Sequence, residues 1–183
     1  MTDTFRTARL ILRRWRDVDI VSFADINADD EVMRFFPSTL SLDETAAMVE
    51  RIESHFDEHG FGLWAVEIDG RLAGFTGLNT TAFDTPMGPH VEIGWRLATW
   101  AWGMGYASEA AREVLRIGFD LGLSTIYSFT TETNVRSASV MKRIGMSRRQ
   151  EFDFDHPRTP QWWGRRHIVY SIDRSEGSSH VPQ

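Results

Sequence analysis

A predicted strand and a predicted helix are joined by a turn with two glycines, Trp102-Gly103-Met104-Gly105-Tyr106-Ala107. Free backbone N–H groups at a helix start, aided by the helix dipole, form a binding site for an anion. Glycines there let a bulky pyrophosphate approach the main chain closely. Because any tight strand-to-helix turn also favours glycine, the turn by itself indicates either a phosphate cradle or an ordinary connection.

Two familiar phosphate loops do not match this turn. The dinucleotide-binding fingerprint needs a third glycine at the position of Ser108, and an acidic residue after the next strand. A nucleotide-binding P-loop needs Gly-Lys-Ser/Thr, whereas the single lysine of the chain, Lys142, lies far downstream. A Rossmann-type oxidoreductase is therefore only a distant alternative.

The segments that position the turn alternate between strand and helix patterns. A capping-box spacing at Ser41 and Glu44 starts a helix that ends near Gly60. Asp69-Gly70 is the two-residue pair of a type I′ hairpin, in which both residues take positive φ. Strands are predicted at 9–15, 64–68, 72–78, 91–97, 125–130 and 167–172, and helices at 17–27, at 41–60, after the glycine turn and at 137–144. This order predicts a mixed α+β domain.

The composition favours an ordinary globular enzyme or binding domain. The chain has 183 residues, 42% of them hydrophobic, which predicts a single domain over residues 1–174 and a flexible tail over 175–183. The formal charge of −6 argues against a general nucleic-acid binder. No apolar run reaches the roughly 18 residues of a membrane helix, and no signal peptide is visible, so the expected location is cytoplasmic.

Metal and thiol chemistry are not expected. The chain has no cysteine, which excludes thiolate ligands and cysteine nucleophiles. Its six histidines show no metal-ligand spacing, because His55 and His59 lie four residues apart but lack an obvious third ligand. We therefore expect no metal site.

Four motifs, in order along the chain, carry a resemblance to a known family. The glycine turn, followed by Ser108-Glu109-Ala110, matches an acyl-CoA loop of the form Arg/Gln-x-x-Gly-x-Gly/Ala with tryptophan in the first place. Residues 92–97 (EIGWRL) match a fourth strand, and Asn134 to Ser137 with residues 140–146 (VMKRIGM) match the helix after a fifth. Residues 7–13 (TARLILR) match a first strand. Over about residues 7–171 the chain thus resembles the GCN5-related N-acetyltransferases (GNAT), specifically the branch around the ribosomal-protein N-terminal acetyltransferases.

The resemblance implies a mostly antiparallel, twisted sheet of about seven strands, flanked by about four helices. It also implies that the fourth and fifth strands splay apart and hold the pantetheine arm of acetyl-CoA between them. Asn134 would contact that arm, with Ser137 near the sulfur, although both residues equally suit a helix cap. The other implied acetyl-CoA contacts are the backbone near Trp95 and Leu97 and the turn residues Trp102, Gly103, Met104, Gly105, Tyr106, Ala107 and Ser108.

The implied reaction is the direct attack of a neutral primary amine on the thioester of acetyl-CoA. An α-amine with a pKa of about 8, or a lysine amine at about 10.4, is mostly protonated at pH 7, so a base assists. Strand alternation places Glu92 on the face opposite Ile93, where it acts either as this base or as a solvated carboxylate. Relatives carry a tyrosine acid where Met141 stands, so Ser137 is the expected hydrogen-bond donor to the leaving sulfur.

The resemblance assigns the choice of acceptor to two loops. They supply Phe35 and Phe36 after the first helix, and Asp153 and Asp155 before the last strand. The two aspartates either hold a cationic amine between aromatic walls or face water while the phenylalanines alternating with them pack inward.

These observations predict an acetyl-CoA-dependent N-acetyltransferase whose acceptor is a small-molecule amine or a protein N-terminus. The main alternative is a non-catalytic acyl-CoA-binding or regulatory domain, which the lack of a tyrosine at Met141 keeps open. Four of the seven tryptophans have three possible roles, namely lining a pocket, forming a homodimer contact or ordinary packing. These four are Trp100, Trp102, Trp162 and Trp163.

Overall fold

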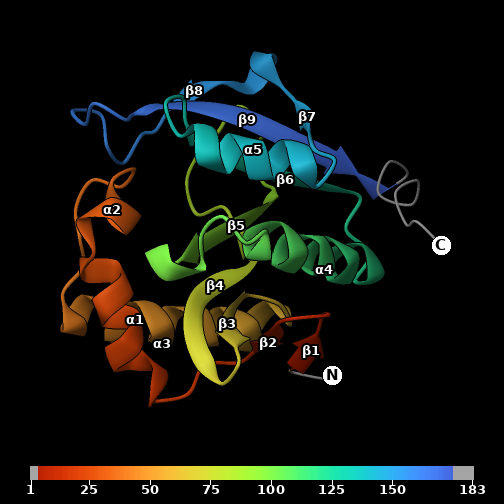
Figure 1. Ribbon diagram of the computed structural model, residues 1–183. Helices are drawn as coiled ribbons and strands as arrows, with labels where there is room; N and C mark the ends of the chain where they lie inside the picture. Colours follow the sequence, from red (N-terminus) through yellow and green to blue (C-terminus); the bar gives the residue numbers. More distant parts are fainter. Residues whose placement is uncertain (1–3, 175–183) are drawn as a thin grey trace.

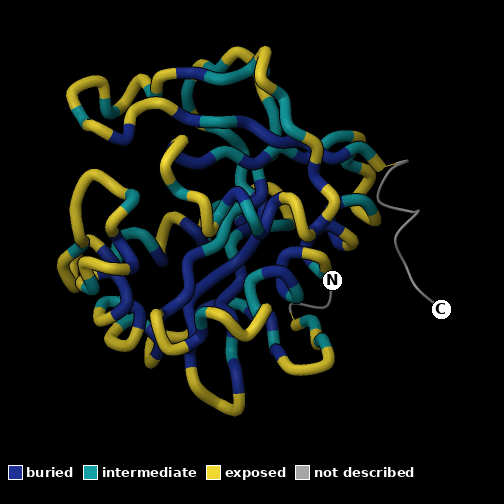
Figure 2. Tube along the Cα trace, turned by 45° about the horizontal axis from the view of Figure 1, so that its top comes forward, coloured by how far each residue is buried: buried dark blue, intermediate teal, exposed yellow. Residues whose placement is uncertain are grey.

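Helices cover both faces of the central strands, which explains why those strands are apolar along most of their length. In β4 (Arg71–Thr80), residues 72–78 are all buried. Phe75 contacts Phe23 of helix α1 (Asp19–Ala28) on one face, with ring centroids 5.9 Å apart. On the other face helix α4 (Tyr106–Asp120) approaches closely through Gly118, where an added Cβ would lie 3.0 Å from Leu78 Cδ1. Figure 2 shows the buried strands at the centre and exposed loops around them.

The computed structural model describes residues 4–174 (Figure 1), so the predicted tail at 175–183 lies outside the described residues. These residues form a nine-stranded sheet in the order β1-β2-β3-β4-β5-β6-β9-β7, with β8 paired to β9. Neighbouring strands are antiparallel except β5 and β6, which are parallel. The other strands are β1 (Thr4–Arg6), β2 (Ile11–Arg13), β3 (Leu63–Ile68), β5 (Val91–Leu97), β6 (Thr125–Thr131), β7 (Ser147–Arg148), β8 (Phe154–Asp155) and β9 (Arg166–Asp173). The other helices are α2 (Asp30–Met33), α3 (Leu42–His59), α5 (Val135–Arg143) and the 3-10 turns η1 (Thr99–Ala101) and η2 (Gln150–Phe152).

Two local signals in the sequence act as predicted. The Ser41 hydroxyl accepts the Glu44 N–H at 3.2 Å, and the Glu44 carboxylate accepts the Ser41 N–H at 2.8 Å, which completes the capping box of α3. Between β3 and β4, Asp69 has φ 49° and Gly70 has φ 78°, as the type I′ turn requires. Both signals depend on neighbouring residues alone, so the sequence is sufficient to predict them.

The mixed α+β class and the mostly antiparallel sheet are confirmed. The structure contains more elements than the expected seven strands and four helices, because β1, β7 and β8 have only two or three residues each and α2 has four. Pieces this short carry no hydrophobic period that a sequence pattern could reveal. Within the predicted first strand at 9–15, only Ile11–Arg13 pairs as a strand.

The two parallel strands diverge, as expected for the fourth and fifth strands of the resemblance. β5 and β6 share one paired position, Glu92 with Tyr127, whereas β4 and β5 pair along the whole of β5. Ser128 Oγ bridges the start of the gap by donating to the Ile93 carbonyl at 2.9 Å. Figure 1 shows β1–β4 on one side of the gap and β6, β9 and α5 on the other.

Within residues 4–174, no helix is both long enough and apolar enough to cross a membrane.

Candidate active site

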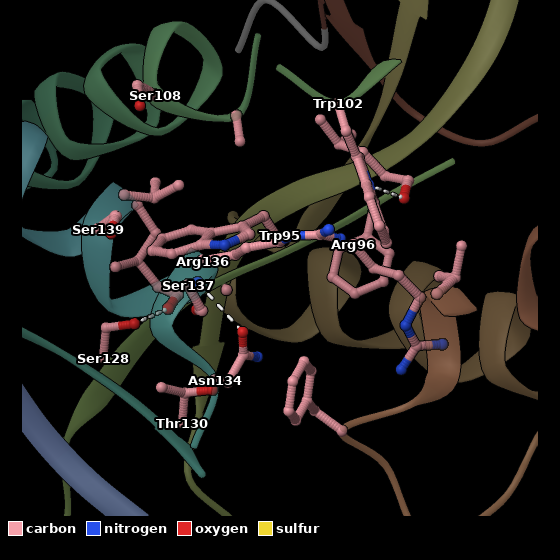
Figure 3. Close-up of a pocket in the computed structure, with 18 of the residues that line it drawn as sticks. Trp95, Arg96, Trp102, Ser108, Ser128, Thr130, Asn134, Arg136, Ser137 and Ser139 are labelled. Atoms are coloured by element: carbon pink, nitrogen blue, oxygen red, sulfur yellow. Dashed lines mark hydrogen bonds between the residues drawn. The ribbon is translucent and has the colours of Figure 1, made fainter. Parts of the chain in front are cut away.

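A cavity of about 1370 Å³ occupies the gap between the diverging strands (Figure 3). Its volume exceeds that of most small-molecule sites, so it accommodates a long ligand together with a second molecule. It does not include Asp153 or Asp155. It brings together the residues expected for acetyl-CoA, the base and the aromatic acceptor wall, namely Phe35, Phe36, Glu92, Trp95, Leu97, Trp102, Gly103, Met104, Gly105, Tyr106, Ala107, Ser108, Asn134 and Ser137.

The glycine turn has the geometry of an anion cradle. Gly103 and Gly105 take φ of 78° and 80°, a region that other residues enter only with strain. Gly105 precedes α4 without a side-chain cap, so the N–H groups of the first helical turn are left for a ligand. A Cβ added at Gly103 would meet nothing within 4 Å, so the approach to the turn is open. These features fit the pyrophosphate of acetyl-CoA.

Side chains of the N-terminal segment hold the turn in place, and one of them, Arg9, also lines the cavity. Arg9 Nη1 donates to the Met104 carbonyl at 2.9 Å, and Arg9 Nε donates to the Glu109 carboxylate at 2.7 Å. Thr7 Oγ1 donates to the same carboxylate at 2.6 Å. Burial raises the pKa of Glu109, but the hydrogen bonds from Thr7 and Arg9 outweigh it, so the pKa lies below its usual value.

Trp102 anchors the turn to the end of β5. Its indole Nε1 donates to the Leu97 carbonyl at 2.8 Å, which occupies one of the backbone groups expected to meet the cofactor. The Arg136 guanidinium lies over the indole ring, 4.6 Å from its centroid. Trp102 and Trp162 line the cavity, whereas Trp100 and Trp163 are exposed.

Glu92 is a half-buried carboxylate in the cavity wall. Burial raises the pKa of Glu92 to about 7, and a long hydrogen bond from Asn79 Nδ2, at 3.5 Å, acts weakly in the opposite direction. A carboxyl group with a pKa near neutrality is well matched to accepting a proton from an amine at pH 7.

Asn134 and Ser137 form the N-terminal cap of α5, and both residues also line the cavity. Asn134 Oδ1 accepts the Ser137 N–H at 3.2 Å and caps α5, while both residues line the cavity (Figure 3). Ser139 Oγ donates to the Val135 carbonyl at 2.7 Å, so its hydroxyl is already engaged. Among the described residues, the Ser137 hydroxyl has no protein partner. Met141 is 0% exposed and packs in the core, away from the cavity.

The two acceptor loops meet across one side of the cavity. Phe35 and Trp163 lie with their ring centroids 6.4 Å apart. Asp153 accepts the Val169 N–H at 3.1 Å and pairs with Arg148, so its carboxylate is fully engaged away from the cavity.

Asp155 is also held by arginines, Arg165 at 3.2 Å and Arg166 at 3.5 Å. The phenylalanine between these aspartates, Phe154, is buried and stacks on His167, and Asp155 is exposed, as the packing alternative expects. Asp153 differs from that alternative, because its side chain is only 12% exposed and does not face water. The arginines that hold the two carboxylates come from other segments, which the local sequence pattern could not show.

The cavity also contains residues to which the sequence analysis assigned no role, among them His156, His167 and Arg96. His156 and His167 line the wall near Trp162, and burial, with the neighbouring His167 and Arg158, lowers the pKa of His156 to about 4. Arg96 lines the wall near Phe36 and is 8% exposed. The signal for Arg96 was present, since it is a cation two positions from Gly94 in a strand whose other residues are mostly apolar. Within residues 4–174, no group of three or more acidic or histidine side chains is placed to hold a metal ion.

Comparison with known proteins identifies relatives of this arrangement. Residues 9–147 match the family model described as "Acetyltransferase (GNAT) domain". The chain is 32% identical over 125 residues to the FsC-acetyl coenzyme A-N(2)-transacetylase of Aspergillus fumigatus, covering 64% of this chain but 52% of that protein, so it spans about half the length of this relative. It is 28% identical over 159 residues to the uncharacterized N-acetyltransferase YnaD of Bacillus subtilis, covering 86% of this chain and 90% of that protein.

Solved structures share the same fold. A GNAT-family acetyltransferase from Bacillus anthracis superposes with a TM-score of 0.75 at 26% identity, covering 94% of this chain and 99% of that one. RimJ of Mycobacterium smegmatis, solved in complex with CoA-disulfide, gives a TM-score of 0.73 at 20% identity, covering 95% of this chain and 84% of that one. At 20% identity the second likeness concerns the fold alone.

Proposed function

The chain belongs to the GNAT acetyltransferase family, an acetyl-CoA-dependent class of enzyme, and we propose that it transfers the acetyl group directly to a primary amine bound beside Phe35 and Phe36. The observation that carries this proposal is that the glycine turn, with its free N–H groups, opens into the same cavity as Glu92. One cavity can therefore hold the donor's phosphates and present a base to the acceptor.

Different residues of the chain bind acetyl-CoA and transfer the proton. The N–H groups from Gly103 to Ser108 hold the pyrophosphate, and the open edge of β5 near Trp95 faces the pantetheine arm. When bound, acetyl-CoA supplies an acetyl thioester with a thiolate leaving group. Glu92 accepts a proton from the attacking amine as the new C–N bond forms and the C–S bond breaks. The Ser137 hydroxyl donates a hydrogen bond to the departing sulfur.

Direct transfer is favoured over an acyl-enzyme route. The chain has no cysteine, the residue best suited to take an acetyl group from a thioester. Met141, buried in the core, supplies no acid, and a thiolate leaving group with a pKa of about 8.5 departs without full protonation. The acceptor remains a small-molecule amine or a protein N-terminus, and the likeness to RimJ concerns the fold and does not decide between the two.

Thermal unfolding with acetyl-CoA, free CoA or NADH, followed by an amine panel, tests the proposal. At about 100 times its dissociation constant a ligand adds roughly 2.7 kcal/mol to the free energy of unfolding. We expect both CoA species to stabilise the protein and NADH to have no effect. Because the protein has no cysteine, a thiol reagent reports only the CoA released on turnover. Binding of acetyl-CoA without thiol release from any amine would indicate the non-catalytic acyl-CoA-binding domain instead.

A further inference from the structure

Among the described residues, Arg96 is a buried cation without an anionic partner. Its side chain lines the cavity, as Figure 3 shows, and the residue is 8% exposed. Nη1 donates to Asn27 Oδ1 at 2.7 Å, which is the side-chain hydrogen bond that Arg96 makes among the described residues. Nε is completely buried and has no acceptor within residues 4–174. Nη2 also has no acceptor in this part of the chain, but unlike Nε it is not completely buried, so a ligand in the cavity can reach it.

The surroundings of Arg96 hold it in place without neutralising it. Asn27 is fully buried on α1, and its Nδ2 donates to Thr45 Oγ1 of α3 at 3.1 Å, so the amide that accepts from Arg96 is fixed. The Phe36 and Phe75 rings lie 4.2 Å and 5.5 Å from the guanidinium carbon. Aromatic faces and one amide compensate a buried positive charge only in part.

The Arg96 guanidinium stays positively charged at pH 7 although it is buried. Burial lowers the pKa of Arg96 to about 10, which still leaves the side chain protonated at pH 7. A buried cation of this kind is strongly stabilised by an anion that enters the cavity.

The position of Arg96 on β5 relates it to the candidate base. Strand alternation places Glu92, Gly94 and Arg96 on one face of β5, and their register against β4 is continuous. Four residues along a strand correspond to about 13 Å between the Cα atoms of Glu92 and Arg96. A Cβ added at Gly94 would meet nothing within 4 Å, so the space between the two charged side chains is open. An acceptor whose amine and carboxylate are separated by several bonds can therefore lie between the two side chains.

We propose that Arg96 binds a carboxylate of the acceptor, which makes the preferred acceptor a small amine that also carries a carboxylate. The inference rests on the proposed acetyltransferase function and specifies its substrate class. Nη2 is the donor that a carboxylate oxygen in the cavity can reach, because Nε is completely buried, and the charge of the guanidinium strengthens this hydrogen bond. A polyamine, or a protein N-terminus whose nearest carbonyl is an uncharged amide, leaves the cation unpaired.

Matched amines test this assignment in the wild-type protein. Lysine is compared with cadaverine, which lacks its carboxylate, and a set of amino acids is compared with their carboxamides and with aminoalkyl phosphonates. We expect kcat/KM to favour the carboxylate member of each pair by about 100-fold or more. Equal rates for acid and carboxamide, or a preference for the phosphonate, would overturn the proposal.

Variants of Arg96 test whether this residue causes the preference for carboxylate-bearing amines. Arg96→Met keeps the apolar volume and is expected to reduce the preference to less than about 10-fold while leaving acetyl-CoA affinity unchanged. Arg96→Lys keeps the charge but replaces the planar guanidinium, so its preference is expected to lie between those of the wild type and Arg96→Met. This variant also covers the case in which Arg96→Met does not fold. Arg34→Met is the control, because Arg34 is an exposed cation beside Phe35 that does not line the cavity. An Arg96→Met protein that keeps the wild-type preference would refute the assignment.

Calorimetry separates failure of this inference from failure of the proposed function. The carboxylate amines are titrated into the wild-type and Arg96→Met proteins saturated with CoA. Binding to the wild type alone, without any thiol release on turnover, would support the carboxylate site and refute acetyl transfer. Thiol release with amines that need no carboxylate would support acetyl transfer and refute the carboxylate site.

Discussion

Arg9 and Glu109, a hundred residues apart in the sequence, are joined by three contacts: the Arg9 backbone N–H, Nε and Nη2 lie 2.9, 2.7 and 2.6 Å from the Glu109 carboxylate oxygens. Glu109 belongs to the first turn of α4, and Arg9 Nη1 also donates to the Met104 carbonyl within the glycine turn. The N-terminal segment and the phosphate cradle are therefore held as one unit. Because the cradle is already ordered, ligand binding loses less conformational entropy.

Glu109→Gln is expected to weaken acetyl-CoA binding by about five- to tenfold. The change removes the charge that orients Arg9, and the loss is about 1 kcal/mol because the arginine is partly exposed. Calorimetric titration with acetyl-CoA measures the change in the dissociation constant. Glu113→Gln is the matched control, since Glu113 pairs with Arg116 on the same helix and does not line the cavity. Equal dissociation constants for the two variants would contradict a role for Arg9 and Glu109 in shaping the cradle.

Comparing Gly103→Ala with Gly122→Ala should separate the effect of backbone strain on stability from the effect of an added methyl group on acetyl-CoA binding. Gly103 has φ 78° and open space where the Cβ would go, and Gly122, after α4, has φ 93° and equally open space. Alanine at either position costs about 1 kcal/mol of stability through the left-handed backbone. Of these two glycines, Gly103 lines the cavity and Gly122 does not, so the Gly103→Ala variant alone should lose about tenfold in acetyl-CoA affinity. Similar melting temperatures with different dissociation constants are the expected result, and equal affinities would argue against phosphate binding at this turn.

The sequence predicted those parts of the fold and site that depend on neighbouring residues. The capping box at Ser41 and Glu44, the Asp69-Gly70 hairpin and the glycine turn are all short-range signals, and each is present. The alternation around Asp153 left two interpretations open, because Arg148 and the Val169 N–H that engage its carboxylate are brought there by the fold. The missing partner of Arg96 is likewise visible only when α1, α3 and β5 are assembled.

Glu92→Gln is expected to lower kcat by about 100-fold or more while acetyl-CoA affinity stays the same. In the wild type, the rate should rise with pH through about 7, because Glu92 accepts a proton only when its own carboxyl is deprotonated. The glutamine variant should lose this inflection. Glu50→Gln, an exposed change on α3 outside the cavity, is the control and should keep the wild-type profile. A pH profile with the same inflection in both variants would assign the proton transfer to another group.

The raised pKa of Glu92 also predicts how stability depends on pH. The folded protein holds the Glu92 proton up to about pH 7, whereas the unfolded chain releases it near the ordinary glutamate pKa of 4.5. The folded state therefore binds more protons between these values, and the contribution of Glu92 to the free energy of unfolding falls as pH rises through that window. Glutamine stays neutral at every pH, so Glu92→Gln should raise the midpoint of thermal unfolding more at pH 8 than at pH 4. A difference between variant and wild type that does not change from pH 4 to pH 8 would show that the Glu92 carboxyl ionises as easily in the folded protein as in the unfolded chain.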